Sequence, residues 1–353
     1  INRRTGGLSK RVTIVDVARA CGLAPSTVSN ALSNKSYVTE KTRQLVLETA
    51  ERLGYRASMT ARSLRTQRTY TIGMLASDIT NSFYAEILSG IEEVAWNRGY
   101  SLIIGNTEFS SAKQSRYIAS MLDKDVDGLL LASHSLTPED VAALERQGVP
   151  VVFLNRYDTR VAADYVGVDN QLGMQLAMSY LIEQGHRRIG FIGGRGVATA
   201  AQERLAGYRF AMMQAGLPVD EALVTEGDYS EESGRQAAAQ VLAGPDRPTA
   251  IMCANDLMAL GAMAHAVQSG LDVPGDISLV GFDDIDFASH PRLSLTTVHY
   301  PRADSGRVAA DMLFDRIEHK GQQPFQNVRL RPHLVVRNSV RAIPVTSDNP
   351  VAV

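Results

Sequence analysis

Residues 13–32 read TIVDVARACGLAPSTVSNAL, and this stretch decides how the first part of the chain folds. Thr13 can cap a helix that carries Asp16 in its first turn, where the positive end of the helix dipole favours an acid. The apolar residues that follow have the i, i+3, i+4, i+7 spacing of one helix face: Ile14, Val17, Ala18 and Cys21. Gly22 ends this helix, since glycine is the residue preferred just after a helix C-terminus.

A second helix begins at Pro25, because proline fits the first helical position. Its apolar face holds Val28, Ala31 and Leu32, and its opposite face is small and polar: Ser26, Ser29, Asn30 and Ser33. A third helix is predicted over residues 39–53, with Gly54 as its terminator and an inward face of Val46, Ala50 and Leu53. Two helices joined by a glycine turn, the second with a polar outer face, predict a helix-turn-helix.

Charge is distributed unevenly along the chain. The 353 residues carry 36 Lys and Arg against 38 Asp and Glu, a net charge of −2. Residues 1–69, which we call the head, hold 13 of the basic residues and four of the acids, so the head carries +9 and the remaining residues, the body, carry −11. Such a head is predicted to bind a polyanion such as DNA, although charge alone is equally compatible with a solvated face.

Composition narrows the class of protein. With 44% hydrophobic and 21% charged residues, the chain is typical of globular proteins and is long enough for two or three domains. The sequence contains no apolar run of about 18 residues, and no apolar stretch follows the basic N-terminus, so neither a membrane span nor a secretory signal is expected. Cys21 and Cys253 provide no disulfide framework. We expect a soluble, cytoplasmic protein.

The stretch 13–32 closely resembles the DNA-binding head of the lac/gal repressor family of bacterial transcription regulators. Leu-Gly-Tyr at 53–55 and Ala-Arg-Ser-Leu at 61–64 resemble the family's third-helix end and hinge helix, and the resemblance continues to about Arg341. It implies three segments in the head: a flexible basic arm (1–11), a helix-turn-helix domain (12–57), and a hinge helix with its linker (58–69).

The resemblance assigns DNA contacts by position. Base edges in the major groove would be read by Pro25, Ser26 and Asn30. Phosphate contacts would come mostly from Thr27, Ser29 and the basic residues of the head, and Thr13 would also contact DNA. In the hinge, Ala61 would also contact DNA, and Leu64 would be an apolar wedge in the minor groove, unless it is an ordinary linker leucine.

Two positions depart from the family pattern. Many relatives have serine where this chain has Ala24, and arginine where it has Asn30. Alanine weakens the cap of the second helix, and asparagine lacks the guanidinium that reads guanine. We therefore expect an operator that differs from those of most relatives at this position.

From Tyr70 onward, apolar runs alternate with helical stretches. The predicted buried strands are 71–76, 101–106, 128–132, 149–154, 188–193, 249–254 and 277–282. The predicted helices include 81–98, 171–184, 202–215, 256–269 and 302–319. This alternation predicts parallel sheets with right-handed crossovers, and a body this long requires two lobes.

The resemblance implies that the lobes are flavodoxin-like, as in a periplasmic sugar-binding protein. The resemblance divides the rest of the chain into a first lobe (about 70–168 and 298–329), a second lobe (about 169–297 and 330–341) and a tail (342–353). The chain would cross between the lobes near residues 167–169, 296–298 and 329–331. The tail has two prolines and no leucine heptad, so a homodimer is expected rather than a coiled-coil tetramer. Helix 85–98 resembles part of the dimer face, although its Ile87, Leu88 and Ile91 are equally suited to the core.

Ligands of parallel α/β sheets lie beyond the carboxyl ends of the strands. The resemblance adds Arg204, Asn255 and Asp283 as positions that contact an effector. The full candidate set is Ser77, Asp78, Phe83, Asn155, Arg156, Arg204, Tyr229, Asn255 and Asp283. Carboxylate, amide and guanidinium groups can bind hydroxyls, and aromatic faces can cover a sugar ring. The alternatives are that Asp283 caps a loop and that Phe83 belongs to the core.

We do not expect an enzyme, a metal site or a cofactor. Gly-Gly-Arg-Gly at 193–196 matches neither the dinucleotide fingerprint nor the phosphate-loop motif, and the sequence has no Gly-x-Ser-x-Gly elbow. The seven histidines lack metal-ligand spacing, and only Asp283-Asp284 could pass for a catalytic pair.

The resemblance implies a dimeric repressor that binds a near-palindromic operator under the control of a small polar effector, a sugar or sugar derivative. A purine or phosphorylated co-repressor is the alternative effector. A sugar-binding protein without a regulatory role is the alternative function, and the basic head argues against it. The sign of the regulation stays open.

Overall fold

The computed structural model describes residues 12–33, 35–55, 68–133, 136–158, 160–319 and 323–344. The chain divides into two compact units, Ile1–Thr69 and Tyr70–Val353. The predicted arm, the hinge residues Ala61 and Leu64, and most of the tail lie outside the described residues. No helix in the described part of the chain is long and apolar enough to cross a membrane.

The described part of the head contains three helices, α1 (Ile14–Cys21), α2 (Pro25–Leu32) and α3 (Glu40–Leu53). Both the backbone N and the Oγ1 of Thr13 donate to Oδ2 of Asp16, at 2.9 and 2.7 Å, which fixes the start of α1. Gly22 and Gly54 end α1 and α3 with φ of 65°, a left-handed conformation that glycine adopts without strain. The three helices enclose a small apolar core that includes Val17, Val28 and Val46. The predicted helix-turn-helix is confirmed.

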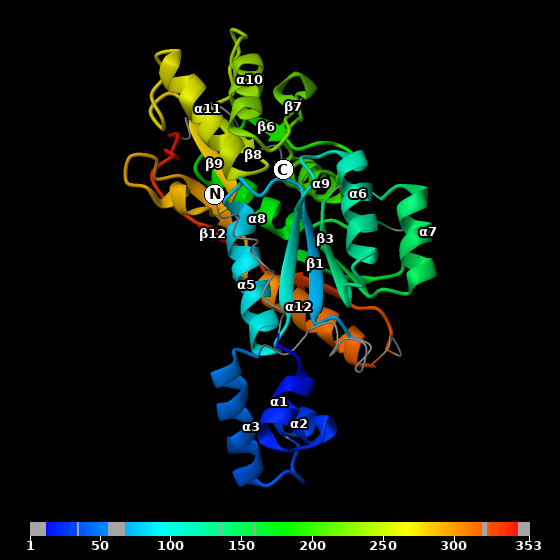
Figure 1. Ribbon diagram of the computed structural model, residues 1–353. Helices are drawn as coiled ribbons and strands as arrows, with labels where there is room; N and C mark the ends of the chain where they lie inside the picture. Colours follow the sequence, from blue (N-terminus) through cyan, green and yellow to red (C-terminus); the bar gives the residue numbers. More distant parts are fainter. Residues whose placement is uncertain are drawn as a thin grey trace, which may run out of the picture. The chain divides into compact units, whose positions relative to one another are not determined.

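The body contains two six-stranded sheets covered by helices (Figure 1). The first sheet has the order β11-β5-β4-β3-β1-β2, and all its strand pairs are parallel. Its strands are β1 (Thr71–Ala76), β2 (Ser101–Asn106), β3 (Gly128–Ala132), β4 (Val151–Leu154), β5 (Asp164–Val168) and β11 (Asn327–Leu330). Its helices are α5 (Phe83–Asn97), α6 (Ser111–Leu122), α7 (Pro138–Gln147) and α12 (Arg302–His319). We call this sheet and its helices the first lobe.

The second lobe has the sheet order β12-β10-β9-β8-β6-β7, in which only the β10–β12 pair is antiparallel. Its strands are β6 (Ile189–Gly193), β7 (Val224–Glu226), β8 (Ala250–Cys253), β9 (Ser278–Asp283), β10 (Thr296–His299) and β12 (His333–Val335). Its helices are α8 (Asn170–Glu183), α9 (Thr199–Gln214), α10 (Glu231–Val241) and α11 (Asp256–Gln268). The predicted two-lobed α/β body is confirmed.

Three crossovers join the lobes, and one lies later in the chain than the sequence predicts. The chain changes lobe between β5 and α8, between β10 and α12, and between β11 and β12. Residues 296–298 were expected at the second crossover but belong to β10, because His299 still pairs with both Asp283 and His333. The second crossover therefore lies at residues 300–301.

Two glycines let α5 and α12 pack backbone to backbone in the first lobe. A Cβ at Gly306 would lie 2.2 Å from the carbonyl oxygen of Ile87, and a Cβ at Gly90 would lie 2.1 Å from that of Ala303. Ile87 is fully buried in the core. The sequence left open whether Ile87, Leu88 and Ile91 belong to the dimer face or to the core. The structure places Ile87 and Ile91 in the core.

We predict that Gly306→Ala destabilises the protein by about 1–2 kcal/mol. Alanine favours a helix by about 1 kcal/mol over glycine. Overpacking costs about 1–3 kcal/mol, and a clash with backbone, which has no rotamer with which to yield, belongs in the upper part of that range, at about 2–3 kcal/mol. Urea denaturation of the full chain measures the difference. Gly244→Ala is the control, because a Cβ there meets nothing within 4 Å. Equal unfolding midpoints for the two variants would contradict this account of the helix pair.

A buried ion pair connects three elements of the first lobe. Arg316 of α12 binds Asp164 at the start of β5 through two contacts, Nε–Oδ2 at 2.6 Å and Nη2–Oδ1 at 2.9 Å. The side chains are 8% and 2% exposed. Asp164 also accepts from the backbone N of Gln326 at 2.7 Å, and Arg316 donates to the carbonyl of Pro324 at 2.8 Å. These bonds fix the segment that leads into β11.

Candidate functional site

The polar face predicted for α2 lies at the surface of the head. Pro25 and Ser26 are exposed, whereas Val28 is buried in the core. The other predicted contacts of α2, Thr27, Ser29 and Asn30, are half-buried. The start of α2 has no side-chain cap, because Ala24 occupies the N-cap. Thr13 is exposed, but its hydroxyl already donates to Asp16.

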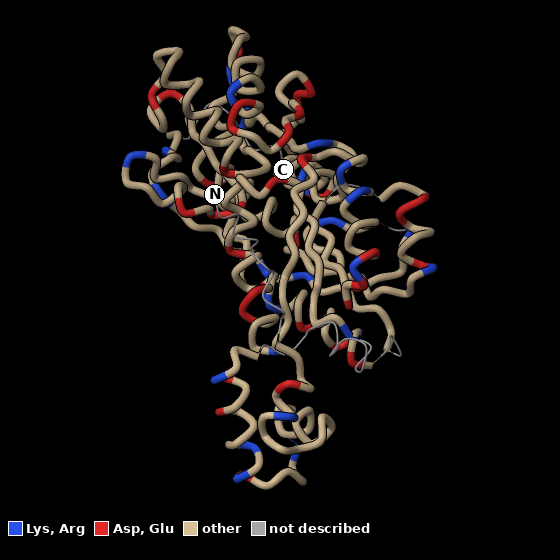
Figure 2. The backbone as a smooth tube through the Cα atoms, viewed as in Figure 1, with Lys and Arg blue, Asp and Glu red and all other residues tan. Residues whose placement is uncertain are grey.

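Figure 2 marks the Lys and Arg positions along the backbone, and most of those in the described part of the head are exposed. Arg19 keeps 78% of its side chain exposed, 3.6 Å from Asp16. Arg43 pairs with Glu40 at 2.7 Å and also donates to the carbonyl of Lys35. Exposed cations and a small polar helix face at the surface of the same unit are what binding to a phosphate backbone and a groove requires.

In the body, seven of the nine predicted effector residues line one cleft. It measures about 400 Å³, including the space open to solvent. The first lobe contributes Asn81, Phe83, Tyr84, Phe109, Asn155 and Arg156, and the second lobe contributes Ala200, Arg204, Tyr229, Asn255 and Asp283. The wall therefore comes from both lobes, at the carboxyl ends of their strands.

Arg204 and Asp283 form the charged floor of this cleft. Arg204 is buried, its Nε donates to Oδ1 of Asn170 at 2.8 Å, and its guanidinium lies 3.8 Å from the ring centroid of Phe282. Its Nη2 lies 3.5 Å from Oδ1 of Asp283, an ion pair too long for a good hydrogen bond. Burial raises the pKa of Asp283 to about 6, against the opposing effect of Arg204 and Arg302.

Arg302, the first residue of α12, connects Asp283 to the first lobe. Its side chain is 3% exposed. One guanidinium nitrogen donates to the backbone carbonyl of Asp283, and another contacts the carboxylate of Glu86 on α5. Asp283 is thus held from the second lobe by Arg204 and from the first lobe by Arg302.

Four buried polar atoms in the cleft have no hydrogen-bond partner. They are Asn155 Oδ1, Arg156 Nε, Tyr229 Oη and Asp283 Oδ1. Buried polar groups in proteins are almost always hydrogen-bonded, so a group of unpaired ones requires an explanation. A polar ligand that enters the cleft would supply the missing partners.

The loops that line the cleft hold four non-glycine residues at positive φ. The values are 55° at Phe109, 60° at Asn155, 73° at Tyr229 and 114° at Asp283. Such conformations cost free energy and persist where the surrounding structure imposes them, which is common at binding sites. Here each directs a side chain at the end of a strand into the cleft wall.

Ser77 and Asp78 do not lie in the wall of the cleft. Ser77 donates to the carbonyl of Ala132 at 3.3 Å. Asp78 accepts from the N and Oγ1 of Thr80, at 2.9 and 2.6 Å, and so stabilises the turn after β1. Both predictions rested on position after a strand, and local hydrogen bonds use these side chains instead.

Asn255 lines the cleft, but most of its hydrogen-bonding capacity is already used. Its Oδ1 accepts from the N of Met258 at 2.9 Å and its Nδ2 donates to the carbonyl of Tyr229 at 3.0 Å. It therefore positions Tyr229 as well as capping α11. Four lining residues were not predicted from the sequence: Asn81, Tyr84, Phe109 and Ala200. The sequence pattern could have identified Phe109, because it follows the strand 101–106 just as Asn155 follows the strand 149–154.

Family models match two stretches of the chain. Residues 13–58 match the lacI family of bacterial regulatory proteins, and residues 178–340 match a periplasmic binding protein-like domain. The HTH-type transcriptional repressor PurR of Vibrio campbellii is 38% identical over 332 residues, 94% of this chain and 99% of that protein.

Solved structures of repressors match nearly the whole chain. The lac repressor dimer bound to operator and the anti-inducer ONPF matches with a TM-score of 0.83 and 29% identity, over 94% of this chain and 100% of that one. The complex of the transcriptional regulator CelR with cellobiose matches with a TM-score of 0.71 and 34% identity, over 93% and 100%.

Proposed function

Because the chain belongs to the lacI family of bacterial regulatory proteins, we propose that it is a repressor whose effector, a sugar or sugar derivative, binds in the cleft of the body. Its relative PurR is an HTH-type transcriptional repressor, and the lac repressor has been solved as a dimer bound to operator and an anti-inducer. The proposal adds the chemical class of the effector, the cleft residues that bind it, and a near-palindromic operator read by Pro25, Ser26 and Asn30.

The observation that carries the proposal is the set of unpaired polar atoms in the cleft. Asp283 Oδ1 and Asn155 Oδ1 are acceptors, Arg156 Nε is a donor, and Tyr229 Oη can serve as either. A sugar hydroxyl both donates and accepts, so neighbouring hydroxyls of one ring suit such a mixed set. The rings of Phe83, Phe109 and Tyr229 can cover its apolar face. The relative CelR in its cellobiose complex supports a sugar.

An effector in this position would act on both lobes. Asp283 belongs to the second lobe, and Arg302 ties its carbonyl to α12 and α5 of the first. A ligand changes an equilibrium by binding one arrangement of the protein better than another. A molecule that satisfies donors and acceptors on both walls would favour the arrangement in which the walls are close.

A purine is the second candidate effector. The ring faces of Phe109 and Tyr229 could stack on a planar base, and a repressor named PurR matches 94% of the chain. A thermal-shift series on the full chain with sugars, sugar acids, sugar phosphates and nucleobases separates the two classes. A ligand at a hundred times its Kd stabilises the folded protein by about 2.7 kcal/mol. A response to nucleobases alone would overturn the sugar proposal.

We predict that Asp283→Asn lowers the affinity for the effector at least tenfold. The substitution keeps the shape but removes the charge, and a charge-assisted hydrogen bond contributes about 1.5–3 kcal/mol. Operator affinity without effector should stay near that of the wild type. Operator titrations with and without saturating effector measure both quantities.

Asp246→Asn is the matched control for this substitution, because Asp246 is exposed and does not line the cleft. A pH series adds a second test. A protonated Asp283 loses its charge, so the affinity of the wild type should fall more than that of Asp283→Asn as the pH drops through about 6. If the variant responds to effector at the wild-type concentration, Asp283 is not part of the binding site.

A further inference from the structure

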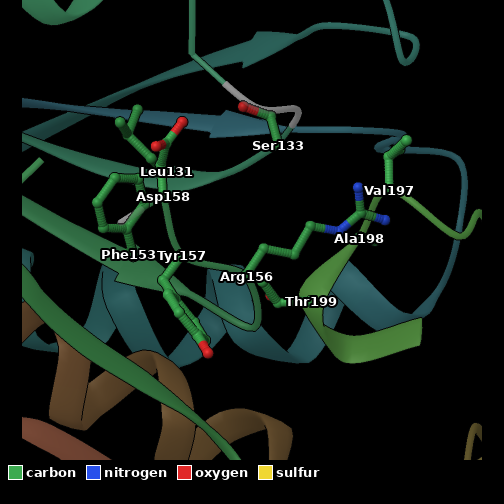
Figure 3. A pocket seen from close by; sticks show the side chains of 9 residues that line it. All are labelled: Leu131, Ser133, Phe153, Arg156, Tyr157, Asp158, Val197, Ala198 and Thr199. Carbon is green, nitrogen blue, oxygen red and sulfur yellow. The ribbon is translucent and has the colours of Figure 1, made fainter. Parts of the chain in front are cut away.

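A second hollow, shown in Figure 3, lies beside the effector cleft, and Arg156 lines both. It measures about 370 Å³, including its opening to solvent. The first lobe contributes Ser133, Arg156 and Asp158 to its wall, and the second lobe contributes Ala198 and Thr199 at the start of α9. Figure 3 shows the side chain of Arg156 extending across this space toward the loop that holds Val197 and Ala198.

Arg156 is a positioned cation without a carboxylate partner. Its guanidinium lies 5.9 Å from the ring centroid of Phe109 and 5.6 Å from that of Tyr229. No ion pair to Arg156 occurs among the described residues, and its buried Nε has no acceptor. A guanidinium that contacts aromatic rings keeps its N–H groups free in its own plane, where they can bind an oxyanion.

A second guanidinium approaches the same ring from the opposite lobe. Arg195, which follows β6, lies 4.7 Å from the ring centroid of Phe109. It pairs with Asp228 at 3.3 Å, yet its Nε is buried without an acceptor. Asp228 already balances the charge of Arg195, so Arg156 is the guanidinium on this ring that lacks a carboxylate partner among the described residues.

Thr199 adds a third unused donor. Its Oγ1 is buried without a partner in the wall of the second hollow. Thr199 is the first residue of α9, and the N-cap, Ala198, has no side chain that could cap the helix. The unpaired hydroxyl therefore lies next to backbone N–H groups at the positive end of a 16-residue helix.

Asp158, the carboxylate in the wall, does not neutralise these donors. It accepts from Arg160 through Nε at 2.9 Å and Nη2 at 2.6 Å, and from the backbone N of Leu136 at 3.2 Å. The hydrogen bond from the Arg160 side chain holds the pKa of Asp158 below its ordinary value, against the effect of burial. Its charge is balanced by Arg160, which leaves the charge of Arg156 uncompensated.

We propose that the effector carries an oxyanion, a phosphate or a carboxylate, which Arg156 and Thr199 bind while its hydroxyls meet Asp283 and Arg204. This inference rests on the proposed function and narrows the effector to a sugar phosphate or a sugar acid. A neutral second sugar ring fits the donors less well. Each of its hydroxyls brings a proton that needs an acceptor, and the unpaired atoms near the second hollow are Arg156 Nε, Arg195 Nε and the hydroxyl of Thr199.

The first experiment uses inorganic phosphate as the probe on the full-length protein at constant ionic strength. Phosphate should raise the melting temperature of the wild type, and Arg156→Met should need at least tenfold more phosphate for the same shift. Arg146→Met is the matched control, because Arg146 is exposed on α7 and lines neither hollow. Any phosphate that binds to the basic head contributes equally to the melting temperatures of the wild type, Arg156→Met and Arg146→Met, so it does not affect the comparison between them. Equal shifts in the wild type and Arg156→Met, or none in the wild type, would overturn the inference.

The second experiment compares a hexose, its uronic acid and its phosphate, together with a neutral disaccharide. Anionic members should bind at least tenfold tighter than the hexose, and Arg156→Met and Thr199→Val should remove that preference. Comparing the affinities of the uronic acid and the sugar phosphate shows whether the site prefers a carboxylate or a phosphate. If neutral sugars bind as tightly as anionic ones, the inference of an oxyanion is wrong, whereas the proposal of a sugar effector stands. If no sugar of any kind binds, the proposed function itself fails.

Discussion

Between 50 and 200 mM salt, the affinity of the protein for its operator is expected to fall about a thousandfold. The head carries +9, and each Lys or Arg that contacts a phosphate releases condensed counterions. About six such contacts produce a loss of this size over this range. Fluorescence anisotropy with labelled operator, plotted as log affinity against log salt, measures the slope.

Two charge variants make the slope specific to the head. Lys35→Gln removes an exposed charge of the head and should reduce the magnitude of the slope by about one unit, which is the share of a single phosphate-binding cation. Lys124→Gln removes an exposed charge of the body, near the end of α6, and should leave the slope unchanged. A nearly flat plot for the wild type would refute DNA binding by the head.

The second large effect expected is on stability. Asp164→Ala should lower the free energy of unfolding by about 3–5 kcal/mol, because it leaves Arg316 buried with its charge unpaired. The backbone N of Gln326 loses an acceptor as well. Urea denaturation of the full chain, followed by circular dichroism, measures the change.

The control for Asp164→Ala is an ion pair of similar length at the surface. Arg209 and Glu221 lie 2.9 Å apart with side chains 49% and 66% exposed, so Glu221→Ala should cost less than about 1 kcal/mol. If both substitutions cost the same, the Asp164–Arg316 pair does not hold α12, β5 and the entry to β11 together.

Local signals explain why the head could be predicted residue by residue. Thr13, Pro25 and the glycines at 22 and 54 act within one helical turn, so their effects can be read from the sequence. The strand ends of the body depend on partners far along the chain. Strand β9 includes Asp283 because His299 pairs with it, and the short edge strands β7, β11 and β12 have little apolar pattern of their own.

The cleft could be predicted in type and place but not in detail. The resemblance to the family identified Asp283 and Arg204, and the position after a strand identified Asn155; all three line the cleft. Hydrogen bonds made within the fold decided the rest. Asp78 accepts from Thr80 in a local turn, and Asn255 caps α11 through the backbone N of Met258. The bond from Asn255 to the carbonyl of Tyr229 joins residues far apart in the sequence, so it is not visible without the tertiary structure.

The positive φ values around the cleft limit how its specificity can be redesigned. Phe109, Asn155, Tyr229 and Asp283 stand in backbone conformations that β-branched residues avoid. A saturation library at these four positions would lose its valine, isoleucine and threonine members to misfolding, and would be enriched in glycine, asparagine and aspartate whatever ligand is selected. Ala200 lies in helix α9 with ordinary backbone geometry and lines the same wall. Directed evolution toward a new ligand should therefore begin there.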